Sequence, residues 1–146
     1  MALRRPAPSH PATEELRRLI AHGRVAIVGP VRQEVLSGIR EQAAFLRLRD
    51  QLRAFDDELL EPADYERAAE HFNTCRAAGV QGSNTDFLLC AIAERRSLPL
   101  LTTDQDFIRY ARLLPLKLHT PFNNGPFGPP SKRRGQLLKS PLIAAP

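Results

Sequence analysis

Apolar residues recur at helical spacing along most of the chain. In the first such segment, Leu16, Leu19 and Ile20 fall on one face of a helix. Prolines near the starts and glycines at the ends of these segments suit helix boundaries. The pattern predicts helices over residues 13–21, 31–40, 41–54, 62–78 and 105–114, and one more opened by Ser83 or Asn84.

Short apolar runs between the helices predict β-strands. Residues 25–28 (VAIV) and 100–102 give the clearest signals, and residues 59–60 and 116–118 give weaker ones. Strands that alternate with helices form a parallel sheet covered on both faces. The sequence therefore predicts an α/β fold with a short parallel sheet flanked by helices.

Length and charge divide the chain into two parts. A chain of 146 residues suits one domain, which we place at residues 1–120. Residues 121–146 contain six prolines, three glycines and four basic residues, and they contain no acid. This segment is expected to be a disordered tail. It carries +4 of the net charge of +5, so RNA binding through its SKRRG run is one hypothesis for function.

Membrane and disulfide classes are not favoured. No apolar run approaches the roughly 20 residues of a membrane-spanning helix. The two cysteines, Cys75 and Cys90, fit neither a disulfide framework nor a zinc-binding spacing. We therefore expect a cytoplasmic protein with reduced cysteines and no membrane partner.

Carboxylates gather in the stretch from residue 82 to residue 107. Asp86 lies in the first turn of a helix, and Asp104 and Asp106 follow the strand at residues 100–102. Glu34 lies one turn into the helix after the strand at residues 25–28. Ligands of parallel α/β sheets bind at the carboxyl ends of the strands. Converging carboxylates suit Mg²⁺, and a metal site of this kind suits phosphodiester hydrolysis.

Helix capping explains the same positions without catalysis. An acid in a first helical turn stabilises the helix by ~0.3–1 kcal/mol through the helix dipole. Asp86 and Asp104 fit that role equally well by position alone, and Glu34 alone is an ordinary half-exposed helical residue. The identity of the surrounding residues is the stronger signal.

Two segments carry a family resemblance. The run SNTDFLLCAIAERRSLPLLTTDQDF resembles the PIN-domain signature, in which an acid opens an apolar helix that leads to a strand and T-x-D-x-D-F. The segment GPVRQEVLSG resembles the helix that carries the family's glutamate. Together, over about residues 11–120, they resemble a VapC-type toxin of a bacterial type II toxin–antitoxin pair.

The resemblance implies both an activity and its residues. It implies a compact three-layer α/β fold, endoribonuclease activity that depends on Mg²⁺ or Mn²⁺, a homodimer, and inhibition by a VapB-type antitoxin. It makes Glu34, Asp86 and Asp104 metal ligands and Asp106 an accessory acid that completes the catalytic set. Thr102 supplies a hydroxyl beside the substrate, and Asn84 orients Asp86 or a phosphate.

One departure from the family pattern leaves a second hypothesis open. Family members begin with a central strand that ends in an aspartate, whereas no aspartate precedes Asp50 in this sequence. Either the start is placed too late, or the chain is an N-terminally truncated copy whose sheet has unpaired strand edges. In the second case, the protein acts only by binding an antitoxin or an intact partner.

Overall fold

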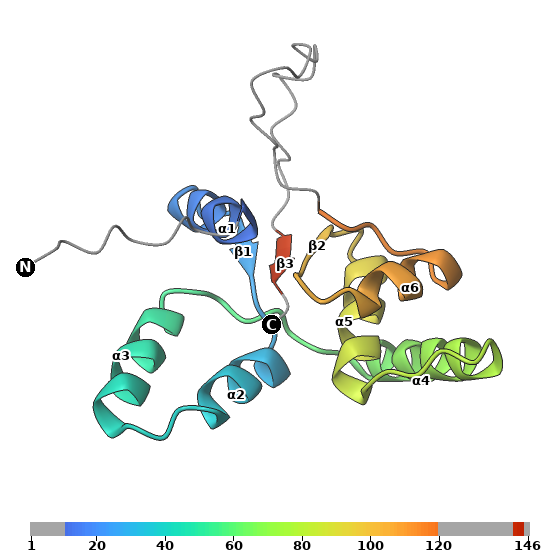
Figure 1. Cartoon of the computed structure of the whole chain (residues 1–146), viewed down its shortest axis with the longest axis horizontal. Coiled ribbons are helices and arrows are strands. Elements are labelled where there is room, and N and C mark those ends of the chain that lie inside the picture. Colours follow the sequence, from blue (N-terminus) through green and yellow to red (C-terminus); the bar gives the residue numbers. More distant parts are fainter. Residues whose placement is uncertain (1–10, 120–141, 145–146) are drawn as a thin grey trace, which may run out of the picture.

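The computed structural model describes residues 11–119 and 142–144, which form a small parallel sheet with helices around it (Figure 1). The first half contains α1 (Pro11–Ala21), β1 (Val25–Ala26), α2 (Gly29–Ser37), α3 (Gln42–Leu52) and α4 (Pro62–Ala77). The second half contains α5 (Asn84–Arg95), β2 (Leu100–Leu101), α6 (Asp106–Leu113) and β3 (Leu142–Ala144). The predicted helices are all present, with their ends shifted by a few residues.

The central strand comes from the end of the chain. The strand order is β1-β3-β2 and both pairings are parallel. The register pairs Val25 with Leu142 and Ala26 with Ile143 on one side, and Leu100 with Ile143 and Leu101 with Ala144 on the other. Two expectations were therefore wrong. Residues 142–144 are a strand rather than part of a disordered tail, and β1 and β2 each have a neighbour instead of an unpaired inner edge.

The two weaker strand predictions had different outcomes within residues 11–119: the one at residues 116–118 is met only by a single parallel bridge to β2, and the one at residues 59–60 was wrong. Leu118 forms only an isolated bridge with Leu100, and residues 59–60 lie in no strand. Instead, Ile27 forms an isolated bridge with Asp57, and Leu59 is 83% exposed. An apolar pair becomes a strand only where a neighbouring strand can pair with it, which the local sequence does not reveal.

The hydrophobic core is organised around α5. Every residue from Phe87 to Ala93 is buried, so the helix is apolar on all sides for two turns. Helical spacing alone accounts for one buried face, formed by Phe87, Leu88, Ala91 and Ile92. A helix that is apolar all round lies inside the protein, where other elements cover every face.

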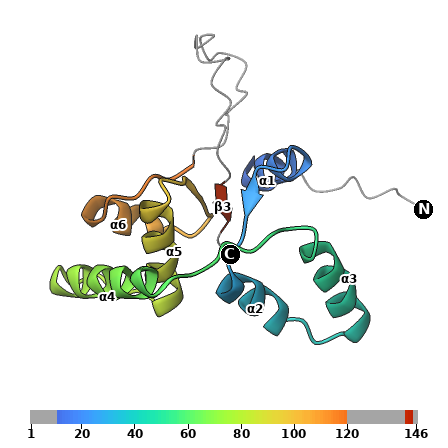
Figure 2. The same cartoon turned by 180° about the vertical axis from the view of Figure 1, so that it is seen from behind.

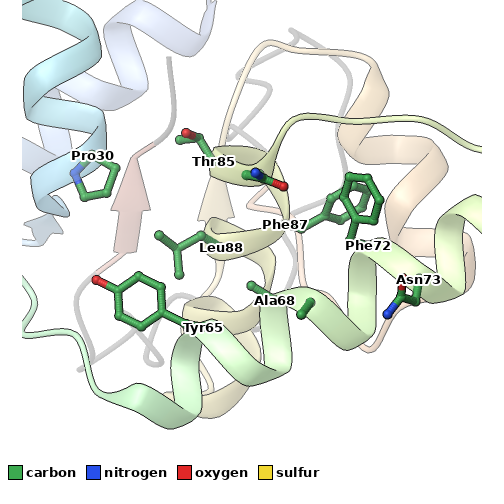
Figure 3. A pocket seen from close by; sticks show the side chains of 10 residues that line it. Pro30, Tyr65, Ala68, Phe72, Asn73, Thr85, Phe87 and Leu88 are labelled. Carbon is green, nitrogen blue, oxygen red and sulfur yellow. The ribbon is translucent and has the colours of Figure 1, made fainter.

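Helix α4 packs along α5. Ala68 and Phe72 of α4 lie beside Phe87 and Leu88 of α5 (Figure 3). The Phe72 ring meets the Phe87 ring edge-on, with their centroids 5.5 Å apart. In both views of the fold, α4, α5 and α6 lie together on one side of the sheet, and α2 and α3 lie on the other (Figures 1 and 2).

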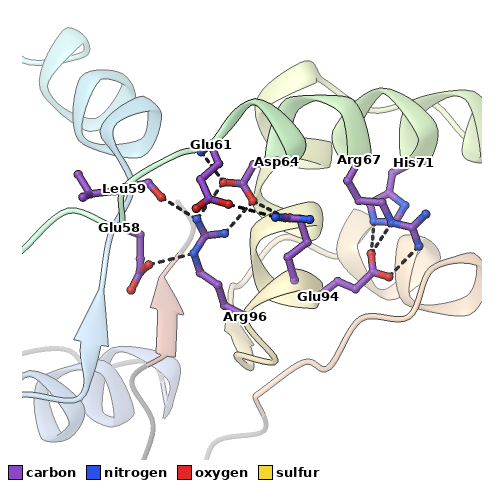
Figure 4. A network of polar contacts seen from close by, with 9 residues as sticks. Glu58, Leu59, Glu61, Asp64, Arg67, His71, Glu94 and Arg96 are labelled. Carbon is purple, nitrogen blue, oxygen red and sulfur yellow. Dashed lines mark hydrogen bonds and ion pairs between the residues drawn. The ribbon is translucent and has the colours of Figure 1, made fainter.

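A buried aspartate links the start of α4 to the end of α5 (Figure 4). Asp64 is 0% exposed and accepts hydrogen bonds from Arg95 Nε at 2.8 Å and from two nitrogens of Arg96, each at 2.8 Å. Arg96 also binds Glu58 at 3.0 Å. The hydrogen bonds from Arg96 hold the pKa of Asp64 well below its usual range. The carboxylate charge is thus neutralised inside the fold.

A second set of paired charges joins the same two helices further along (Figure 4). The Glu94 carboxylate accepts hydrogen bonds from Arg67 at 2.9 and 2.7 Å and lies 2.8 Å from His71 Nε2. His71 is buried, and its burial lowers its pKa. We call this group, together with Asp64, Arg95 and Arg96, the α4–α5 ion cluster.

Two further expectations can be compared with the structure. Cys75 and Cys90 are free and buried, as expected for reduced cysteines. Across residues 11–119 and 142–144, no helix combines the length and the apolar character needed to cross a membrane. The basic SKRRG run lies outside the described residues.

Candidate functional site

Asp86 is held in the first turn of α5 by a reciprocal cap. The Ser83 hydroxyl accepts a hydrogen bond from the Asp86 backbone N–H at 3.1 Å, and Ser83 N–H donates to Asp86 Oδ2 at 3.0 Å. This capping box satisfies two backbone donors that the helix start leaves free. The capping hypothesis is therefore correct for this residue, and Ser83 rather than Asn84 is the N-cap. The cap uses only Oδ2 of the Asp86 carboxylate and leaves Oδ1 out of the capping box.

Tyr110 of α6 reaches the same carboxylate from inside the protein. Its hydroxyl lies 3.2 Å from Asp86 Oδ2 and 3.3 Å from the carbonyl oxygen of Gln81. Burial raises the pKa of Tyr110 above its usual range, and the negative charges of Asp86, Asp106 and Asp104 raise it further. Of the three acids, Asp86 is the one that contacts the hydroxyl directly.

The loop after β2 brings Asp104 and Asp106 together. The Thr102 hydroxyl accepts a hydrogen bond from Asp104 N–H at 3.0 Å, and Asp104 Oδ1 accepts one from Asp106 N–H at 2.9 Å. These two bonds bend the chain from the strand into α6. Thr102 thus lies beside Asp104 and fixes its backbone, while its place beside the substrate stays a prediction.

We call Asp86, Asp104 and Asp106 the carboxylate site. Within residues 11–119 and 142–144, Asp86 and Asp104 form no ion pair with any Lys, Arg or His. Asp106 has one ion pair, with Arg109 at 3.5 Å, and both side chains are largely exposed. The described part of the protein thus neutralises little of the negative charge of the site.

Glu34 lies on a different helix from these three acids. It is exposed on α2, and the structure shows no hydrogen bond or ion pair for it among the described residues. In that part of the chain, no three His, Cys, Asp or Glu side chains are grouped so that they could hold a metal ion. Neither the predicted set of Glu34, Asp86 and Asp104 nor the three acids of the carboxylate site therefore form a grouped three-ligand metal site in that part of the chain.

Asn84 faces a groove instead of Asp86. The groove has a volume of about 440 Å³ and runs between α4, the first turns of α5 and Pro30 at the start of α2 (Figure 3). Tyr65, Phe72 and Thr85 also line it. The hydrogen bonds that orient Asp86 come from Ser83 and Tyr110, so the predicted orienting role of Asn84 is not what the structure shows.

Sequence reasoning missed Tyr110. A usable signal was present, because Phe107 and Tyr110 lie three residues apart on the face of α6 that turns inward. A tyrosine buried on such a face needs a partner for its hydroxyl, and the nearby acids are suitable acceptors. That argument points to a polar contact but does not identify Asp86.

The donor chemistry of the carboxylate site suits a hard divalent cation. Its side chains offer only oxygen ligands, and Mg²⁺ is commonly bound by one or two carboxylates together with water and phosphate. Asp86 and Asp104 satisfy that requirement in chemical type, and the described part of the protein places no cationic side chain in an ion pair with either of them. Zinc and other softer metals would prefer the cysteines, which are buried elsewhere in the core.

A comparison with protein families identifies the class. The PIN domain family matches residues 8–113, which is most of the chain, and this chain belongs to that family. The family assignment carries with it a PIN-like α/β fold, which is generally a nuclease fold and generally uses divalent metal ions. No curated protein matches the sequence.

Proposed function

We propose that this protein is an endoribonuclease that depends on Mg²⁺ or Mn²⁺ and serves as the VapC-type toxin of a type II toxin–antitoxin pair. The observation that carries the proposal is the carboxylate site of a PIN-family chain, in which Asp86 and Asp104 have no described cationic partner. Asp86 and Asp104 would hold the cation, and Asp106 would assist. Glu34 remains in the proposal as a separate acid on α2.

Electrostatics explains why RNA cleavage at this site requires a cation. Like charges repel each other, so carboxylates alone would repel a phosphate. When bound, a divalent cation neutralises charge on the phosphodiester and promotes ionisation of a water nucleophile. The side chains keep their own tasks, since Ser83 and Tyr110 fix Asp86 and Thr102 fixes Asp104.

The reaction is hydrolysis of one phosphodiester bond. The water oxygen forms a bond to phosphorus as the bond from phosphorus to the leaving ribose oxygen breaks, with the two oxygens in line. The water loses a proton, for which the partly exposed Asp106 carboxylate is the nearby acceptor. The leaving oxygen takes a proton from solvent.

The partners follow from the proposed role. RNA is the substrate, a VapB-type antitoxin is the inhibitor, and the toxin is a homodimer in the cytoplasm. Free, buried thiols at Cys75 and Cys90 fit a reducing compartment. Size-exclusion chromatography with light scattering tests the dimer, because the proposal predicts twice the mass of one chain.

RNA cleavage by matched variants tests the activity. We expect cleavage with Mg²⁺ or Mn²⁺ and none with EDTA. Asp86→Asn and Asp104→Asn should each lower the rate by at least about 100-fold, the upper end of the effect of changing residues around a metal. Asp56→Asn makes the same change at an exposed position and should cleave like the natural chain. Cleavage that survives EDTA and both substitutions contradicts the proposal.

A non-catalytic interaction protein is the second candidate. It is favoured by the lack of a grouped set of three metal ligands in the described residues. This candidate predicts no RNA cleavage with either metal and tight binding of an antitoxin or an intact PIN partner. The same cleavage assay distinguishes the two, because only the nuclease responds to Asp104→Asn. For Glu34→Gln, a loss of rate would show that Glu34 takes part in the reaction.

A further inference from the structure

We infer that Tyr110 is a positioning residue that fixes one oxygen of Asp86 and leaves the other for the cation. The inference rests on the proposed function only in treating Asp86 as a cation ligand. It assigns a role to a buried side chain that lies outside the set of acids.

The hydrogen bonds of Asp86 fall on a single oxygen. Ser83 N–H lies 3.0 Å from Oδ2, and the Tyr110 hydroxyl lies 3.2 Å from the same atom. No described residue bonds Oδ1. Because Tyr110 has one hydroxyl proton, it donates either to Asp86 or to the Gln81 carbonyl at 3.3 Å. The carboxylate is the stronger acceptor, since hydrogen bonds to charged groups are about twice as strong as neutral ones.

Packing of aromatic rings sets the position of the hydroxyl. Tyr110 is 0% exposed, and its ring centroid lies 5.0 Å from that of Phe87 and 5.2 Å from that of Phe107. Phe87 directly follows Asp86 in α5. The hydroxyl is therefore held by the same helix that carries its acceptor, and the Asp86 carboxylate is oriented by the core rather than by solvent.

Gly82 shows how closely the backbone fits the hydroxyl. A Cβ atom at this position would overlap the Tyr110 hydroxyl and would lie 2.8 Å from Tyr110 Cζ and 3.0 Å from Phe87 Cε2. Space, rather than an unusual backbone conformation, thus requires glycine here. The loop that leads to the Ser83 cap is shaped around the hydroxyl group.

Removing the hydroxyl alone tests the inference. Tyr110→Phe keeps the ring contacts with Phe87 and Phe107 and leaves Oδ2 with one hydrogen bond. The carboxylate is then free to turn, and we expect the dissociation constant for Mn²⁺ to rise about tenfold, as for outer partners of metal ligands. Mn²⁺ binding to the full chain is measured by electron paramagnetic resonance, which does not depend on RNA cleavage.

The chain offers a matched control, because it contains only two tyrosines. Tyr65→Phe removes the other tyrosine hydroxyl, on the exposed side of α4, and should leave Mn²⁺ affinity unchanged. Gly82→Ala is a second variant that displaces the Tyr110 hydroxyl while keeping it, and it should weaken Mn²⁺ binding in the same direction. A purely structural role would lower the melting temperature of Tyr110→Phe without changing the affinity of its folded form.

The outcomes separate this inference from the proposed function. Tyr110→Phe that binds Mn²⁺ like the natural chain overturns the positioning role while the nuclease proposal stands. A second outcome is that the natural chain binds Mn²⁺, Tyr110→Phe binds it more weakly, and the natural chain cleaves no RNA. This result supports the positioning role and overturns the nuclease proposal. A natural chain that binds no Mn²⁺ overturns both. In an active enzyme, Tyr110→Phe should raise the half-saturating Mg²⁺ concentration about tenfold and change the saturated rate far less.

Discussion

The α4–α5 ion cluster and the carboxylate site hold the same type of side chain in opposite electrostatic surroundings. Asp64 lies between two arginines, and Glu94 lies between Arg67 and His71. Asp86 and Asp104 have no cationic side chain within ion-pair distance in the described part of the protein. Both sets of acids lie close to helix ends, so position alone does not distinguish them.

The difference separates acids that stabilise the fold from acids that remain available for binding. A neutralised carboxylate contributes to stability and has little capacity for a further cation. Uncompensated carboxylates close together repel one another, and proteins keep such arrangements mainly where function requires them. We therefore expect substitutions in the ion cluster to change stability and substitutions in the carboxylate site to change cation binding.

The largest expected effect is on stability, in the ion cluster. Asp64→Ala leaves Arg95 and Arg96 without their buried partner and should lower the free energy of unfolding by about 3–5 kcal/mol. Urea denaturation measures the change. Asp50→Ala, which breaks exposed pairs with Arg49 and Arg53, should cost less than about 1 kcal/mol. Equal losses in the two variants would contradict the distinction.

The next effect concerns cation-dependent stability at the carboxylate site. Without Mg²⁺, Asp104→Asn should change the free energy of unfolding by no more than about 1 kcal/mol, the worth of a helix cap. At a Mg²⁺ concentration 100 times its dissociation constant, the natural chain should gain ~2.7 kcal/mol and the variant almost nothing. Urea denaturation with and without Mg²⁺ measures both, with Asp56→Asn as the control. A variant that gains as much as the natural chain would remove Asp104 from the cation site.

Acid should weaken the ion cluster in two steps. The pKa of His71 is lowered from 6.5 by burial, so the unfolded chain takes up that proton first and stability declines as pH falls below about 6.5. The pKa values of Glu94 and Asp64 are lowered from 4.5 and 3.8, so their contribution is complete above those values and is lost below them. Urea midpoints between pH 8 and pH 3 measure both steps. His71→Gln should remove the first decline in stability. If the variant still shows that decline, a group other than His71 causes it.

The smallest effect is expected at the edge of the carboxylate site. Arg109→Ala removes an exposed ion pair to Asp106, and the free energy of unfolding should change by less than about 0.5 kcal/mol. A loss above 1 kcal/mol, measured in urea, would show that Asp106 is neutralised by the protein after all. The contrast between the two regions would then be weaker than the geometry indicates.

Helices were the most predictable part of the fold. Periodicity located all of them, because spacing at 3.6 residues is a local property of the sequence. The central strand was not predictable, since Leu142–Ala144 is a short run in a segment rich in proline and glycine. Its partners, β1 and β2, lie far away in the sequence, and strand pairing over such distances leaves no local signal.

The candidate site was predictable in part. The motif placed Asp86, Asp104 and Thr102 near one another, because short-range spacing on either side of one strand fixes them. Glu34 was grouped with them through the family resemblance, and among the described residues no group of three possible metal ligands is found. Tyr110 was missed because its role arises from a contact across 24 residues of sequence.

Anomalous diffraction from crystals of the full chain grown with Mn²⁺ is the most direct test of the account. We predict a manganese peak at coordination distance from Asp86 and Asp104, with Asp86 contributing Oδ1 and keeping Oδ2 on Ser83 and Tyr110. A manganese ion bound elsewhere, or a carboxylate site that stays empty in a preparation that cleaves RNA, would contradict the central claim.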